Sequence, residues 1–299
     1  MSTEHSTRVT GVATRSRRVT AAFALCFFLG ATGVAGATSW TVNYVAGTHP
    51  AQAQSSTVNA PTGGSVTSPK STSQLVSWVK PATGATPSGY QVTRNGSAVA
   101  SGGCSGTIAA TSCTDSGLTA NTAYTYSVKA IVGTNWTSAA SGTFSGTTNS
   151  TFVVTSITST NFSGNTIGKM GVGDTFVVTF NYPVNPSTIN TTAGASTMTL
   201  VGGSSTTTIK ISNLSSASGF SVASNYVAST ITSTAAGTLS LSNANKTVTF
   251  TVTGAPTNSS SLAAGAAVTF TFTPLATIQN TSGDTASTSF SQSTALQIF

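Results

Sequence analysis

Charged side chains are scarce in this sequence, and their distribution argues against one class of partner. Asp, Glu, Lys and Arg make up 5% of the 299 residues, with four acids and eleven bases. Four bases and one acid precede residue 19, so the rest of the chain has seven bases, three acids and a net charge of +4. Those seven bases are scattered, whereas a nucleic-acid surface needs clustered Lys and Arg or interleaved aromatics. We predict no nucleic-acid partner.

Groups that transfer protons or bind metals are also few. After residue 37 the chain has one histidine (His49), two cysteines and the acids Asp115, Asp174 and Asp284. Acid–base catalysis needs a titratable group placed against its substrate or another group, and a calcium site gathers several carboxylates in one loop. Each Asp stands next to Gly or Ser-Gly, which predicts that it caps a turn. G-x-S-x-G, P-loop, H-E-x-x-H and CxxC motifs are absent. We predict no enzyme activity, no metal and no cofactor.

The N-terminal segment has the pattern of an export signal. Residues 1–18 are polar and basic, residues 19–37 are small and apolar, and Ala35-Gly-Ala37 has the small-x-small form that signal peptidase prefers. The segment resembles the signals of actinobacterial surface proteins. We expect a signal peptide over 1–37, cleaved after Ala37, and an extracellular or cell-surface protein. The alternative is an uncleaved anchor, since a bilayer span needs about 20 apolar residues. We expect no other contact with a membrane.

Residues 38–57 follow as an expected flexible leader that pairs at most briefly as an edge strand. His49 lies here with no neighbouring His, Cys or carboxylate, and is predicted to be solvated rather than a metal ligand.

One strand near the middle of the chain fixes the fold of the first domain. Large side chains alternate there with polar ones, which is the period of a strand with one buried face; they are Tyr124, Tyr126, Val128 and Ala130. Upstream, Leu118 and Thr122 stand at the spacing at which Tyr124 can act as a corner tyrosine that pins the loop entering the strand. With Val128 they match the pattern of fibronectin type III domains, which this region resembles.

That resemblance implies a β-sandwich over residues 58–148. Trp78, in a predicted strand over 74–78, falls where the family has a buried tryptophan, so we expect it in the core. Tyr90, Val92 and Arg94 alternate in the next predicted strand, and Asn95-Gly96 predicts a hairpin. Residues 139–147 are expected to form the last strand.

Cys104 and Cys113 are predicted to form a disulfide. The third cysteine, Cys26, would leave with the signal, and exported proteins reach an oxidising compartment. Two free thiols are the alternative.

Trp136 follows the key strand in a predicted loop, and it is the tryptophan that we expect to be most exposed. Packing over the end of the sandwich and stacking against a ligand are the two interpretations of its position.

The remaining residues, 149–299, predict a second antiparallel β-sandwich. Three strands alternate apolar with polar residues, at 175–180, 248–252 and 268–272, and no stretch has a capped helical period. The run from Gly173-Asp174 through Pro183-Val184 to Ile189 is similar to bacterial Ig-like modules of surface-layer proteins and adhesins. That resemblance covers about 153–299. The chain is thus expected to be all-β, with two tandem antiparallel β-sandwiches.

The outward positions of these strands carry Thr, Ser and Asn instead of Lys and Glu. Three explanations remain open: packing against copies of the protein or a wall polymer, O-glycosylation, and the strand propensity of threonine. We predict a non-catalytic adhesion, spacer or envelope-structural protein whose partner is a cell-wall or extracellular polymer, or itself. The alternative is a carbohydrate-binding accessory module that uses exposed aromatics.

Overall fold

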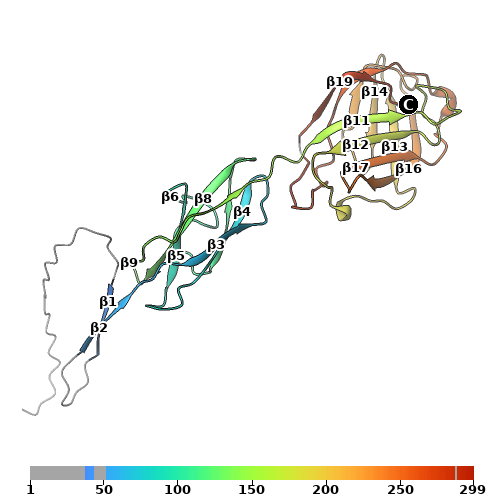
Figure 1. Ribbon diagram of the computed structural model, residues 1–299. Helices are drawn as coiled ribbons and strands as arrows, with labels where there is room; N and C mark the ends of the chain where they lie inside the picture. The colour runs from blue at the N-terminus through green and yellow to red at the C-terminus, as the bar shows by residue number, and fades with distance from the viewer. Residues whose placement is uncertain (1–37, 44–51, 287) are drawn as a thin grey trace, which may run out of the picture. The chain divides into compact units, whose positions relative to one another are not determined.

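The computed structural model describes residues 38–43, 52–286 and 288–299, and these form an all-β protein, as predicted (Figure 1). Strand β1 (Thr38–Asn43) pairs antiparallel with β2 (Gln52–Thr57). The predicted leader therefore contains a hairpin of its own instead of joining a neighbouring sheet as an edge strand. Cys26, the expected cleavage site at Ala37, and His49 lie outside the described residues.

The first domain consists of two antiparallel sheets. One sheet has the order β3-β4-β7 and contains β3 (Thr62–Thr67), β4 (Ser73–Val79) and β7 (Ser112–Ser116). The other has the order β10-β8-β5-β6, with β5 (Gly89–Arg94), β6 (Ser97–Ala98), β8 (Ala123–Val132) and β10 (Phe144–Thr147), and a short β9 (Trp136–Thr137) beside β8.

The core of this domain follows the predicted alternation. In β8 the alternate residues Tyr124, Tyr126, Val128 and Ala130 are all buried. Trp78 is buried as expected, and its ring packs edge-on against Tyr90 with centroids 5.3 Å apart. Burying the apolar face of each strand against the opposite sheet supplies the main driving force for this fold.

The predicted hairpin at Asn95-Gly96 is present between β5 and β6. Both residues have positive φ, 51° and 82°, which a two-residue turn between antiparallel strands requires and which Asn and Gly tolerate best. The Oδ1 atom of Asn95 also accepts a hydrogen bond from the backbone N–H of Thr125 at 3.0 Å, which ties the turn to β8.

The last strand of the first domain is shorter than predicted, because β10 begins at Phe144 and not at residue 139. Before it, the serine hydroxyls of Ser138 and Ser141 accept hydrogen bonds from the backbone N–H groups of Ala130 and Val128. These side chains take the place of backbone carbonyls, so the segment follows β8 without forming a regular ladder.

The second domain is built on a seven-stranded antiparallel sheet with the order β11-β12-β17-β16-β13-β14-β15. Its strands are β11 (Val154–Thr160), β12 (Thr175–Phe180), β13 (Ser196–Gly202), β14 (Thr207–Ile211), β15 (Phe220–Val222), β16 (Thr232–Ser242) and β17 (Thr247–Val252). A two-stranded sheet of β18 (Val268–Phe272) and β19 (Phe290–Leu296) completes it, with β18 beside β15 and β19 beside β11.

Aromatic rings fill the space between the two sheets of the second domain. Phe176 of β12 and Phe220 of β15 stack with centroids 5.7 Å apart, and Phe220 stacks on Phe270 of β18 at 5.0 Å. The three strands singled out from the sequence are all present, and the apolar residues on one face of β12 (Phe176, Val178, Phe180) and of β17 (Val248, Phe250, Val252) are buried.

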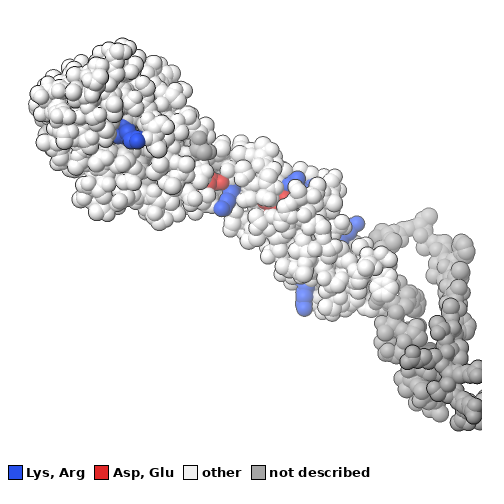
Figure 2. All heavy atoms as spheres, turned by 180° about the vertical axis from the view of Figure 1, so that it is seen from behind, with Lys and Arg blue, Asp and Glu red and all other residues white. Residues whose placement is uncertain are grey.

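Helical structure in the described residues is confined to two short 3-10 turns, η1 (Pro186–Thr188) and η2 (Ser259–Ser261). Within the same residues, no helix is long and apolar enough to cross a membrane. On the face drawn in Figure 2, Lys and Arg side chains stand apart from one another, and Asp or Glu atoms are visible beside some of them.

Candidate binding sites and the buried polar groups

The loop that enters β8 is fixed by a corner tyrosine, as predicted. The Tyr124 hydroxyl accepts a hydrogen bond from the backbone N–H of Thr119 at 2.8 Å. Leu118 is buried beneath the loop, and the Thr122 hydroxyl donates to the carbonyl of Ala120. These three side chains have structural roles in the domain.

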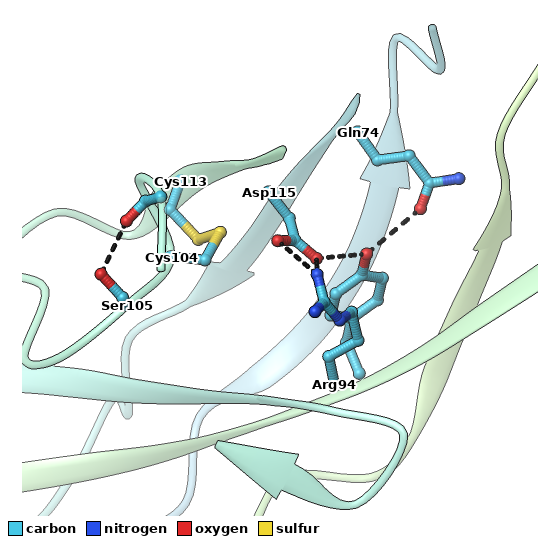
Figure 3. The surroundings of a disulfide bond; sticks show 8 residues. Gln74, Arg94, Cys104, Ser105, Cys113 and Asp115 are labelled. Carbon is cyan, nitrogen blue, oxygen red and sulfur yellow. Dashed lines mark hydrogen bonds and ion pairs between the residues drawn. A yellow bond between two sulfur atoms is a disulfide. The ribbon is translucent and has the colours of Figure 1, made fainter. Parts of the chain in front are cut away.

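Cys104 and Cys113 form the predicted disulfide. Both cysteines are buried, at 1% and 7% exposure, and they join the loop after β6 to strand β7 (Figure 3). The bridge is therefore part of the core and does not present a thiol pair to solvent.

Asp115 does not cap a turn, and the prediction for this residue was wrong. It lies inside β7, is completely buried, and faces Arg94 of the opposite sheet (Figure 3). One guanidinium nitrogen of Arg94 donates to both carboxylate oxygens, at 3.0 and 3.1 Å. The same guanidinium lies over the ring of Tyr124, 5.7 Å from its centroid, which adds a cation–π contact.

Tyr126 completes this network from β8. Its hydroxyl donates to Asp115 at 2.9 Å, and the amide oxygen of Gln74 lies 3.3 Å away. Because the hydroxyl has one proton, the shorter contact to the ionised carboxylate is the stronger bond. Burial raises the pKa of Tyr126 well above its ordinary value, and the hydrogen bond and negative charge of Asp115 raise it further.

The other two acids do organise turns, as predicted. The carboxylate of Asp174 accepts hydrogen bonds from the backbone N–H of Phe162 and Gly171 and from the side chain of Asn165. Asp284 closes the turn that begins at Asn280, with the backbone N–H of Asp284 donating to the Asn280 side chain at 2.8 Å.

All acids after residue 37 are consequently buried, at 0%, 1% and 8% exposure for Asp115, Asp174 and Asp284. Across the described part of the chain, no group of three His, Cys, Asp or Glu side chains is close enough to hold a metal ion. These carboxylates serve internal hydrogen bonds, which is the usual condition of a buried polar group.

Of the site residues predicted from the sequence, Trp136 is the most exposed. A loop was predicted for residues 133–136, whereas Trp136 opens β9 and pairs with Val132 of β8 directly after the turn; 36% of its surface is exposed. With Val132, Gly133, Thr134 and Asn135 it lines a shallow pocket of about 340 Å³. An aromatic ring beside amide and hydroxyl groups can stack against a ligand and hydrogen-bond to it.

Three of the other exposed apolar residues lie in one segment, and none of them was singled out in the sequence. Phe162, Ile167 and Val172 all lie in the segment that joins β11 to β12. Isolated apolar residues in a polar loop carry no periodic signal, so only the structure shows that they are exposed.

The family comparison agrees with the two-sheet arrangement and the corner tyrosine of the first domain. The model described as "Fibronectin type III domain" matches residues 59–145. Residues 59–145 form a fibronectin type III domain. The Leu118, Thr122 and Tyr124 pattern that led to this expectation lies within the matched residues.

Part of this chain is similar to a curated enzyme. A poly(3-hydroxybutyrate) depolymerase of Ralstonia pickettii is 43% identical over 105 residues, which are 35% of this chain and 20% of the depolymerase. The chain therefore spans about one fifth of the length of that enzyme.

Solved structures that are similar to parts of this chain include the following two. A segment of two fibronectin type III domains from chicken tenascin is 16% identical, with a TM-score of 0.27, and covers 77% of this chain and 96% of that segment. A family 28 exopolygalacturonase of Yersinia enterocolitica is 19% identical, with a TM-score of 0.28, over 32% of this chain and 21% of the enzyme.

Proposed function

We propose that this protein is a non-catalytic adhesion, spacer or envelope-structural protein of the cell surface or the extracellular space. Its β-sandwiches hold surfaces at a distance from the site of attachment, and its partner is a cell-wall or extracellular polymer, or a second copy. The second domain would act as a bacterial Ig-like module, and the segment 1–37 as an export signal of the actinobacterial type.

The observation that carries this proposal is that the three aspartate carboxylates are engaged inside the protein. Each of Asp115, Asp174 and Asp284 is buried and hydrogen-bonded to other groups of the chain, so none is free to act on a substrate. A general acid or base must reach the proton that it transfers, and these side chains cannot do so without breaking the local structure.

The similarity to the depolymerase is consistent with a shared accessory module. The 105 matched residues are about the length of one sandwich domain and are a fifth of that enzyme. A segment of this size fits a part that holds or positions other domains.

The test combines localisation with a search for activity. Cells that produce the protein are fractionated, the N-terminus of the mature chain is sequenced, and the purified protein is assayed against polyesters, polysaccharides and peptides. We expect the protein in the envelope or the medium, a start at Thr38 and no turnover. Turnover that copurifies with the protein, or retention in the cytoplasm, would contradict the proposal.

The pocket beside Trp136 supports a second candidate, a carbohydrate-binding accessory module. Its exposed indole lies beside the polar residues Thr134 and Asn135 in the same hairpin. Sugars bind to such combinations by stacking their apolar faces on the ring and hydrogen-bonding at its edge.

Replacing Trp136 separates ligand stacking from packing. If the ring binds sugar, Trp136→Ala loses retention on insoluble polysaccharide while the melting temperature is unchanged. Val79→Ala is the matched control, because Val79 is also exposed and lies in the same domain. A lower melting temperature with retention unchanged would assign Trp136 to packing.

A further inference from the structure

The segment 161–174 between β11 and β12, here called the apolar loop, exposes three large hydrophobic side chains. The exposed fractions are 56% for Phe162, 68% for Ile167 and 46% for Val172. In Figure 1 this loop leaves the tip of β11 and returns into β12. Single exposed hydrophobic residues are common on soluble proteins, but three on one short loop indicate a binding surface.

The backbone of the apolar loop is held by Asp174 rather than by the hydrophobic side chains. The carboxylate accepts from the N–H groups of Phe162 at 2.8 Å and Gly171 at 2.7 Å. The Asn165 amide donates to both Asp174 and the carbonyl of Val172. These bonds bring the two ends of the loop together, so the exposed side chains are presented on a preorganised backbone.

The middle of the loop is anchored in the domain. Met170 is buried, the N–H of Gly168 donates to the carbonyl of Phe299 at 2.8 Å, and the N–H of Gly265 donates to the carbonyl of Gly168 at 2.9 Å. Gly173 has φ of 93° and lies against the Phe162 ring, where a Cβ would come within 2.5 Å of Cγ. The conformation therefore depends on groups other than Ile167 and Val172.

The charge of the apolar loop and the area that it exposes restrict the kinds of partner that it can bind. Lys169 is the other charged residue of the loop besides the internally bonded Asp174, and residues 38–299 carry a net charge of +4. A stable protein–protein contact needs roughly 1,000 Å² of buried surface, more than three side chains and one lysine provide. A lipid surface needs no matching shape, and it takes apolar side chains into its interface while anionic headgroups attract bases.

We propose that the apolar loop docks on a lipid bilayer that contains anionic headgroups. Phe162, Ile167 and Val172 enter the boundary between headgroups and acyl chains, and Lys169 contacts the phosphates. The second domain would thereby be held against a membrane independently of the N-terminal segment, which departs from the expectation that only that segment could contact a membrane.

A fluorescent label in the loop reports this contact directly. The full chain, with Cys26→Ser so that one thiol is free, carries an environment-sensitive dye at Ser163→Cys. The control dye is at Ser242→Cys. Ser242 is exposed, is the last residue of β16 and pairs with Thr247, so it lies away from the end of β12 to which the apolar loop connects. With vesicles of equal parts phosphatidylcholine and phosphatidylglycerol, we expect a blue shift and a several-fold rise in emission at residue 163 and no change at residue 242.

Variants test whether the hydrophobic side chains cause the contact. Phe162→Ser with Ile167→Ser should abolish the blue shift at residue 163, whereas Val79→Ser, in the first domain, should leave it unchanged. The melting temperature of the second domain serves as the folding check, because both replaced side chains are largely exposed. The dye position distinguishes docking of the loop from binding through residues 1–37, which all variants share.

The lipid assignment fails on any of three results. The first is an unchanged spectrum at residue 163 on these vesicles. The second is a blue shift without lipid that grows with protein concentration, which would mean that a second copy covers the loop. The third is a blue shift on an apolar polyester film but not on vesicles. An equal shift on pure phosphatidylcholine would overturn the role given to anionic headgroups and Lys169.

Discussion

Arg94 and Asp115 form an ion pair that links the two sheets of the fibronectin type III domain, at 3.0 Å between Nη1 and Oδ1. The carboxylate is fully buried, whereas 31% of the Arg94 side chain is exposed. Removing the arginine leaves a buried negative charge with the Tyr126 hydroxyl as its remaining side-chain partner. That arrangement is costly, although the exposure of Arg94 lessens the effect.

We therefore expect Arg94→Ala to lower the free energy of unfolding of this domain by about 2 kcal/mol. Lys129→Ala is the control, because it also removes one positive charge from this domain, at a residue of β8. It should change the free energy of unfolding by less than about 0.5 kcal/mol. Urea unfolding followed by tryptophan fluorescence reports on the first domain, since the second contains no tryptophan. Equal effects of the two variants would contradict the role of the pair.

Alkaline pH should destabilise the same domain through Tyr126. Its pKa is raised from 10.0 by burial and by Asp115, so above pH 10 the unfolded chain releases a proton that the folded chain retains. The free energy of unfolding then falls as pH rises, by up to about 1.4 kcal/mol per pH unit for this group. In Tyr126→Phe, the free energy of unfolding should fall less steeply between about pH 10 and 12. Identical slopes for the two proteins would rule out this assignment.

Loss of the disulfide should weaken the first domain without unfolding the second. Replacing Cys104 and Cys113 together by Ser opens a bridge with a sequence separation of 9, for which chain entropy predicts a loss of about 2 to 3 kcal/mol. Urea unfolding with fluorescence detection measures the loss. Thiol titration of the unfolded, unreduced mature protein should find no free cysteine, and two thiols would refute the bridge.

Asp174→Asn should loosen the apolar loop. The carboxylate accepts from three donors with two oxygens, and an amide offers one oxygen and turns two N–H groups toward donors. We expect a loss of about 2 kcal/mol and faster hydrogen exchange at the Phe162 and Gly171 amides. Asp284→Asn, in a turn of the same domain, is the comparison, and it should leave exchange in the loop unchanged. Protection retained at both amides in Asp174→Asn would count against this role.

The sequence was most informative where burial alternates with exposure. The period of two predicted β4, β5, β8, β12, β17 and β18, because one face of each strand must be apolar. The corner at Tyr124 and the disulfide were also correct, since both depend on local spacing or on compartment. Strands β13 to β16 were not singled out, because small and polar residues dilute their pattern.

Asp115 shows why the polar network was missed. Its neighbours Ser116 and Gly117 indicate a turn, and its partner Arg94 is brought close only by the packing of β7 opposite β5. A signal was nevertheless present: Asp115 shares the strand parity of the buried Cys113, two residues earlier. The exposure of Phe162, Ile167 and Val172 likewise depends on how the loop folds, which spacing along the chain does not encode.

The burial of every carboxylate after residue 37 also determines how the outside of these domains responds to its surroundings. Residues 52–299 contain no histidine and their acidic side chains are at most 8% exposed, so the charge at their surface is carried almost entirely by lysine and arginine. Neither residue type changes charge near neutral pH. Acidification or mild alkalinity of the medium would leave the exterior electrically constant, and an attachment made through it would persist through such changes.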